Sequence, residues 1–186
     1  MGKRLRRSYG APPPEPYDGI ILRSQKREGA LVLTVFTRQD GLQHVYVSRT
    51  GKALKSGMGN LQAFGEISFD AWQQGGALRL SEYESKGGAL LRDVTLEQFS
   101  YAAVFVEMVL YLFPEPVADM GAYTLIRRYG RFLPIKDSRI VTVLAGWQLV
   151  RQAGLCPDIG TVSLYKGHHA VTGEVQYYLS DEAVPE

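Results

Sequence analysis

The chain contains a single cysteine, Cys156, among its 186 residues. One cysteine excludes an internal disulfide framework of the kind that holds small secreted domains together. It fits a reducing cytosol, although a secreted protein without disulfides would look the same. No apolar run follows the basic start of the chain, Met1–Arg7, so we expect no secretory signal.

Long hydrophobic runs are also missing. The longest apolar stretch, Tyr101–Phe113, contains Glu107 and is shorter than the roughly 20 residues that a helix needs to cross a bilayer. We therefore expect no membrane segment and a cytoplasmic protein.

The sequence lacks the short motifs of common enzyme classes. It has no Gly-x-Ser-x-Gly elbow, no His-Glu-x-x-His site and no Walker A phosphate loop. Cys156 and the adjacent His168 and His169 do not supply the four converging ligands of a structural zinc site. We expect a protein that is not an enzyme and that holds neither zinc nor another cofactor.

Charge is unevenly distributed along the chain. The net charge is only +2, yet residues 1–60 hold 11 Lys/Arg and 4 Asp/Glu, whereas the remainder is acidic overall. This asymmetry favours a polyanion as the partner of the N-terminal half. The first nine residues include four basic ones and precede the proline-rich segment 11–16, predicted to be extended. These basic residues are predicted to form either an accessory DNA-binding arm or a tail without a role. They are Lys3, Arg4, Arg6 and Arg7.

Five stretches in the first half are predicted to be β-strands, the first as an apolar run and the others by their period-2 alternation. They cover residues 19–23, 31–36, 44–47, 64–72 and 77–85. Asp40-Gly41 suits a tight hairpin because glycine adopts the positive φ that such turns need. Tyr46 is predicted to point away from the core. Tyr83 is predicted to point away as well, opposite Leu78 and Leu80.

The second half has the signals of helices. Thr95 and Gln98 form a capping box at the start of a helix that ends near Phe113 and is apolar on most sides, as in the middle of a bundle. Two more helices are predicted over 119–131 and 137–153, the last ending at Gly154 as a C-cap.

Together these patterns predict an α+β protein. Five short strands with a long connection between the third and the fourth are typical of an OB-type barrel. Such a barrel binds oligonucleotides on the face of its second and third strands. An SH3-like barrel would share much of this pattern. The predicted order is an arm (1–16), an OB-fold domain (17–86), a helical domain (87–159) and a hairpin-like tail (160–186).

The loop 49–60 combines three glycines with three basic residues, which suits contact with phosphates. With the basic residues of the first two turns and Tyr46 as a stacking platform, it forms the predicted DNA-binding set. This set is Lys26, Arg27, Arg38, Tyr46, Arg49, Lys52 and Lys55. For Tyr46, packing beneath the basic loop is the alternative.

Several segments in this order resemble the RecO family of bacterial recombination mediators. They are the strands 19–23 and 31–37, the basic loop 49–56, the helix with Tyr101-Ala102 and Glu107, and the segment 154–159. The resemblance implies an OB-fold followed by a helical domain, binding of single- and double-stranded DNA, annealing of complementary strands and a nucleoid-associated location. It implies RecR and the acidic tail of single-stranded DNA-binding protein as partners. Through these partners the protein would help to load RecA.

The chain also departs from that family. Many RecO proteins carry a cysteine zinc site where this sequence has Gly160 and Thr161, so we expect the tail to replace the metal module. Four basic residues of the helical domain are candidates for docking an acidic partner tail, or are solvated surface; they are Arg127, Arg131, Lys136 and Arg139. Two other functions stay open: a protein-interaction adaptor that has lost DNA affinity, and an RNA-binding OB protein.

Overall fold

The computed structural model describes residues 13–27, 30–48, 61–74, 76–87, 94–114, 116–155, 163–168 and 175–180. Its contacts divide the chain into two compact units, residues 1–154 and 155–186. Within the described residues no helix is long and apolar enough to cross a membrane.

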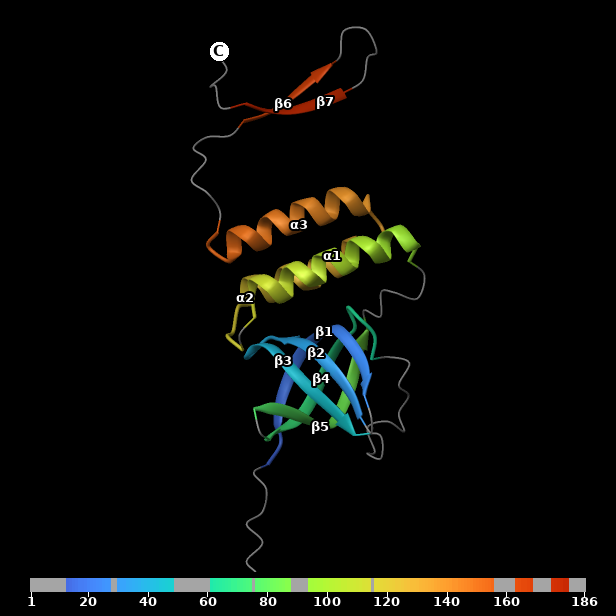
Figure 1. The fold of residues 1–186 in the computed structure, drawn as a ribbon, viewed down its shortest axis with the longest axis vertical. Coiled ribbons are helices and arrows are strands. Elements are labelled where there is room, and N and C mark those ends of the chain that lie inside the picture. The colour runs from blue at the N-terminus through green and yellow to red at the C-terminus, as the bar shows by residue number, and fades with distance from the viewer. Residues whose placement is uncertain are drawn as a thin grey trace, which may run out of the picture. The chain divides into compact units, whose positions relative to one another are not determined.

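Five strands in the first unit close into a barrel in the order β1-β2-β3-β5-β4 (Figure 1). They are β1 (Glu15–Arg27), β2 (Ala30–Thr37), β3 (Gly41–Ser48), β4 (Glu66–Gln74) and β5 (Ala77–Gly87). Neighbouring strands run antiparallel except β3 and β5, which pair in parallel at Val45–Leu78 and Tyr46–Arg79. This confirms the predicted barrel, and the arrangement fits the OB type.

Strand β1 is longer than the sequence predicts. The prediction ended it before Gln25 and assigned Pro16 to an extended segment outside the fold, whereas the strand spans Glu15–Arg27. Residues 15–20 pair with β4 and residues 19–27 pair with β2, and the β1–β2 ladder contains a register shift between Ile21 and Arg23. A barrel closes only when one strand reaches both neighbours, so β1 continues through polar residues that lack a buried face.

Strand β5 changes its alternation half-way. Leu80 pairs with Ala71 and Tyr83 with Phe69, with a register shift between Asp70 and Ala71. An extra residue in one strand turns the following side chains to the other face. Tyr83 therefore packs against the barrel core, and its predicted outward orientation was wrong.

The described part of the chain holds three helices, α1 (Leu96–Leu112), α2 (Met120–Phe132) and α3 (Ser138–Gln152). Both bonds of the Thr95–Gln98 capping box are present, and Asp119 and Asp137 accept bonds from the first turns of α2 and α3. Gly154 follows α3 with a φ of +73°. The predicted helix starts and the glycine stop are confirmed.

Two cores hold the first unit together. One fills the barrel, with Leu33, Val35, Val45 and Val47 among its members. The other lies between barrel and helices, where Ile20, Leu22 and Phe36 pack against the buried faces of α1, α2 and α3. Figure 1 shows the helices gathered on one side of the barrel.

Helix α1 contributes to this second core on one face only. Ala102, Phe105, Val106 and Val109 are buried, whereas Tyr111 is 85% exposed. Leu96, Phe99 and Val104 are exposed as well. The predicted position in the middle of a bundle was therefore wrong, because no further helix of the described residues covers this side.

The second unit contains β6 (Ser163–His168) and β7 (Val175–Ser180), which pair antiparallel. The prediction that this tail replaces a metal module stays a prediction, since Cys156, Gly160, Thr161 and His169 lie outside the described residues.

Candidate nucleic-acid interface

A row of side chains crosses the outer face of the barrel. Strand pairing aligns Gln25 of β1 with Val32 of β2, Val32 with Tyr46 of β3, Tyr46 with Arg79 of β5, and Arg79 with Trp72 of β4. Residues paired in this way point to the same side of a sheet. The core-facing neighbours Val45, Val47, Leu78 and Ala71 are buried, so the row faces outward.

The exposed end of this row alternates aromatic and basic side chains. Tyr46 is 40% exposed and Trp72 is 36% exposed, and Arg79 between them is exposed as well. An unpaired base stacks on such aromatic faces, and an arginine beside them contacts the phosphate that connects two bases.

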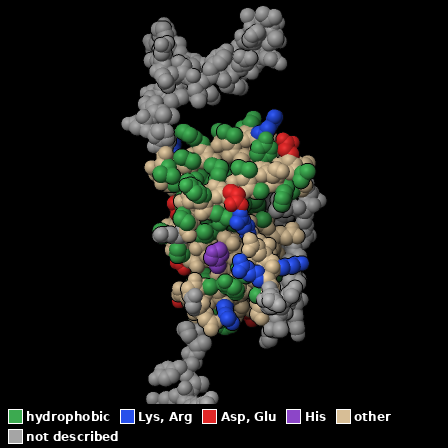
Figure 2. All heavy atoms as spheres, viewed as in Figure 1, with side chains coloured by type: hydrophobic (Ala, Val, Ile, Leu, Met, Phe, Trp, Pro, Cys, Tyr) green, Lys and Arg blue, Asp and Glu red, His purple; other side chains and the backbone are tan. Residues whose placement is uncertain are grey.

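The other end of the row opens into a concave surface of about 220 Å³. Val32 and Thr34 of β2 line it together with Arg23 and Arg27 of β1, His44 and Tyr46 of β3, and Leu110 of α1. Figure 2 shows one face of the molecule, on which Lys and Arg side chains gather over the barrel and hydrophobic side chains gather over the helices.

Two arginines give this concave surface its charge. Arg23 forms an ion pair with Glu107 of α1, so its charge is partly compensated. Arg27 is exposed and has no ion-pair partner among the described residues. Arg27 is thus the side chain best placed to contact a phosphate next to Tyr46.

Comparison with known proteins found no relative of this chain. No family model and no characterised protein matches this chain. The site is therefore interpreted from its own geometry.

The structure separates the predicted DNA-binding residues into groups. Arg27 and Tyr46 line the concave surface, while Lys26 lines a different recess beside Leu61 and Phe99. Arg38 lies at the β2–β3 turn, beside a recess against α2. Seven predicted residues lie outside the described part of the chain: Lys3, Arg4, Arg6, Arg7, Arg49, Lys52 and Lys55.

Three of the four candidates for docking a partner form ion pairs within the chain. Arg127 and Arg131 form ion pairs with Glu66 of β4, at 3.0 Å and 3.1 Å, and Arg139 pairs with Asp137. Lys136 is exposed in the turn before α3. Their role in binding a partner stays a prediction.

Sequence reasoning did not include Arg23, His44, Trp72 and Arg79 in the site. His44, Trp72 and Arg79 occupy outward positions of alternating strands, which the sequence indicates, whereas Arg23 follows a continuous apolar run. His44 lies two residues before Tyr46 on β3, whereas the other three residues come near Tyr46 through strand pairing. Arg79 and Trp72 do so through the parallel pairing of β3 with β5.

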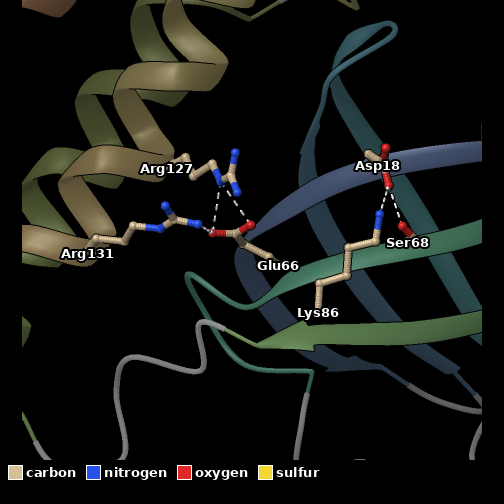
Figure 3. Close-up of polar contacts among 6 residues, drawn as sticks. All are labelled: Asp18, Glu66, Ser68, Lys86, Arg127 and Arg131. Atoms are coloured by element: carbon tan, nitrogen blue, oxygen red, sulfur yellow. Dashed lines mark hydrogen bonds and ion pairs between the residues drawn. The ribbon is translucent and has the colours of Figure 1, made fainter.

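A second charged cluster lies on the α2 side of the barrel, around Asp18. Its carboxylate accepts a hydrogen bond from Lys86 Nζ at 2.8 Å and another from Ser68 Oγ (Figure 3). These two bonds, Lys86 first, lower the pKa of Asp18 below its ordinary value, against a smaller opposing effect of burial.

We expect this cluster to make folding stability depend on pH. A carboxyl whose pKa is lower in the folded state stabilises the fold above its unfolded pKa of about 3.9, and this contribution is lost as the pH falls through and below that value. Asp18→Asn should therefore lose less stability than the wild type between pH 5 and pH 3 in urea unfolding. Asp70→Asn, at an exposed position of β4, is the matched control. Equal pH profiles for wild type and Asp18→Asn would contradict the expectation.

Proposed function

We propose that this protein is a RecO-like recombination mediator that binds single-stranded DNA across the outer face of its barrel. The observation that supports this most directly is the row of Tyr46, Arg79 and Trp72, which continues into the concave surface beside Arg27. Stacking platforms next to arginines on an open groove are what a protein needs to hold an unpaired strand without reading its sequence.

The barrel type supports the same proposal. OB-type barrels bind oligonucleotides on the face of their second and third strands, and the concave surface lies on β1, β2 and β3. A strand that ran from this surface along the row would cross β3, β5 and β4 in turn. It would meet arginine and aromatic side chains in alternation.

The finer parts of the proposal rest on the resemblance to the RecO family. They are binding of duplex DNA, annealing of complementary strands, and partnership with a RecR-like protein and the tail of single-stranded DNA-binding protein in support of RecA. Stacking and phosphate contacts do not distinguish DNA from RNA, so competition between matched DNA and RNA oligonucleotides is the measurement that separates them.

A salt series with a fluorescent single-stranded oligonucleotide tests the proposal. We expect log affinity to fall linearly with log salt, because each neutralised phosphate releases counterions. Arg27→Ala/Arg79→Ala should weaken binding and flatten the slope by about 1.4 units, since each contact to a single strand contributes about 0.7. The control is Arg128→Ala/Arg151→Ala, which removes the same charge from exposed positions on α2 and α3.

Equal slopes for the two double variants would show that this face is not the binding surface. Absence of binding even at low salt would favour the second candidate, a protein-interaction adaptor. A stripe on α3 favours that role, because Ile140, Val143, Leu144 and Trp147 are 59%, 70%, 59% and 49% exposed on one face of the helix. Capture of a RecR-like protein would then be the next experiment.

A further inference from the structure

A polar recess of about 310 Å³ lies where α2 meets the barrel. It is lined by charged and hydroxyl-bearing side chains from β1, β4, β5, α2 and the β2–β3 turn. They include Asp18, Arg38, Glu66, Lys86, Tyr123 and Arg127. Figure 3 shows two groups of contacts here, Glu66 with the arginines of α2, and Asp18 with Lys86 and Ser68.

Arg127 is held so that part of its guanidinium stays available. Its Nε donates to both carboxylate oxygens of Glu66, at 3.0 Å and 3.1 Å, and Arg131 Nη2 donates to the same carboxylate at 3.1 Å. Glu66 is thus engaged by two arginines. The terminal nitrogens of Arg127 have no carboxylate partner among the described residues, and a fork of this kind binds phosphate or carboxylate oxygens.

Arg38 is a second available donor. Its side chain has no hydrogen bond or ion pair among the residues that the structure describes, although it lies close enough to Asp18 to help lower the pKa of that carboxyl. Tyr123 adds a neutral donor. Burial, followed by the charges of Glu66 and Asp18, raises the pKa of Tyr123, so its hydroxyl keeps its proton near neutral pH.

The charges of the recess do not cancel. Among the residues that line the recess, Arg38, Lys86 and Arg127 carry three positive charges, whereas Asp18 and Glu66 carry two negative ones. The balance of +1 favours an anionic ligand, and the available donors of Arg38 and Arg127 suit a phosphate monoester, which offers three acceptor oxygens and carries about −1.5 to −2 at pH 7.

We propose that this recess binds the phosphate monoester of a small ligand or of a nucleic-acid end, with Arg38 and the terminal nitrogens of Arg127 as its main contacts. The volume of about 310 Å³ lies at the lower end of the usual range for small-molecule sites and suits a mononucleotide. A 5′-phosphate at the end of a strand has the same chemistry. None of the lining residues belongs to the row of Tyr46, Arg79 and Trp72, so the proposal does not rest on binding of a strand there.

Calorimetric titration of the whole chain with adenosine monophosphate and with inorganic phosphate tests the site. We expect Arg38→Ala to weaken binding by about tenfold or more, because it removes a charged hydrogen-bond donor from an exposed position without disturbing the core. Arg127→Lys, which keeps the charge and removes the fork, should weaken it as well. Arg128→Ala, the next position on α2 but outside the recess, should leave binding within about twofold.

Oligonucleotides with a 5′-phosphate or a 5′-hydroxyl identify the source of the phosphate. Tight binding of adenosine monophosphate would identify a mononucleotide ligand. A preference for the 5′-phosphate that Arg38→Ala abolishes would identify a strand end. In either case Tyr46→Ala/Trp72→Ala should leave binding of adenosine monophosphate unchanged. Equal effects of Arg38→Ala and Arg128→Ala, or no binding of any phosphate ligand at millimolar concentration, would overturn the proposal.

Discussion

Replacing Tyr46 and Trp72 by alanine together should weaken binding of a single-stranded oligonucleotide by about 2 kcal/mol or more, roughly 30-fold. Stacking of one base on an aromatic side chain contributes about 1–3 kcal/mol, and the variant removes two such side chains from one row. Fluorescence anisotropy at one fixed salt concentration is the measurement. Because no charge is removed, the slope of log affinity against log salt should stay that of the wild type.

The matched control is Trp147→Ala, which removes a half-exposed tryptophan from α3. It should leave oligonucleotide binding within about twofold. If Trp147→Ala weakened binding as much as the double variant does, the strand would bind on the helices. If the double variant bound as the wild type does, the row on the barrel would not be the stacking surface.

Replacing Phe105 by alanine should lower the free energy of unfolding by about 3–5 kcal/mol. The Phe105 side chain is fully buried and stacks on Tyr129, with the ring centroids 3.7 Å apart and the planes 15° apart. Tyr129 in turn contacts Phe64, and its hydroxyl is 3.0 Å from Thr142 Oγ1 of α3. The variant leaves a cavity between barrel and helices, and urea unfolding followed by circular dichroism measures its cost.

Phe99→Ala serves as the control because Phe99 lies on the same helix and is 51% exposed. Its loss should be well below that of Phe105→Ala, as for most exposed positions. Similar losses for the two variants would mean that the aromatic stack contributes little beyond the exposed side chain.

The elements that sequence reasoning predicted well are those with local signals. The starts of the three helices follow from Thr95, Asp119 and Asp137, because each side chain accepts hydrogen bonds from the turn that follows it. Alternation over a few residues correctly placed Val45 and Val47 in the core and Tyr46 outside.

Features that depend on distant segments were not predictable in the same way. The length of β1 is set by its two partners, β2 and β4, since its last residues are polar and exposed. The outward prediction for Tyr83 failed because it continued the phase of Leu78 and Leu80 past the register shift between β4 and β5.

The candidate sites also combine features with local sequence signals and features that depend on distant segments. Tyr46 and Arg27 were found because a basic turn and an outward aromatic residue are local properties. The alignment of Tyr46 with Arg79 and Trp72 depends on the order in which the strands close the barrel. The association of Arg38 with α2 depends on where the helices pack, which no local pattern of the first half indicates.

The core shared by barrel and helices limits how this protein can be divided. Ile20, Leu22 and Phe36 lie on barrel strands, yet their side chains are covered by the helices. A barrel truncated before residue 94 would expose these side chains to water as a hydrophobic patch. Exposed patches of this kind usually lead to self-association. For transplantation into another protein, the smallest transferable piece is therefore the barrel together with all three helices.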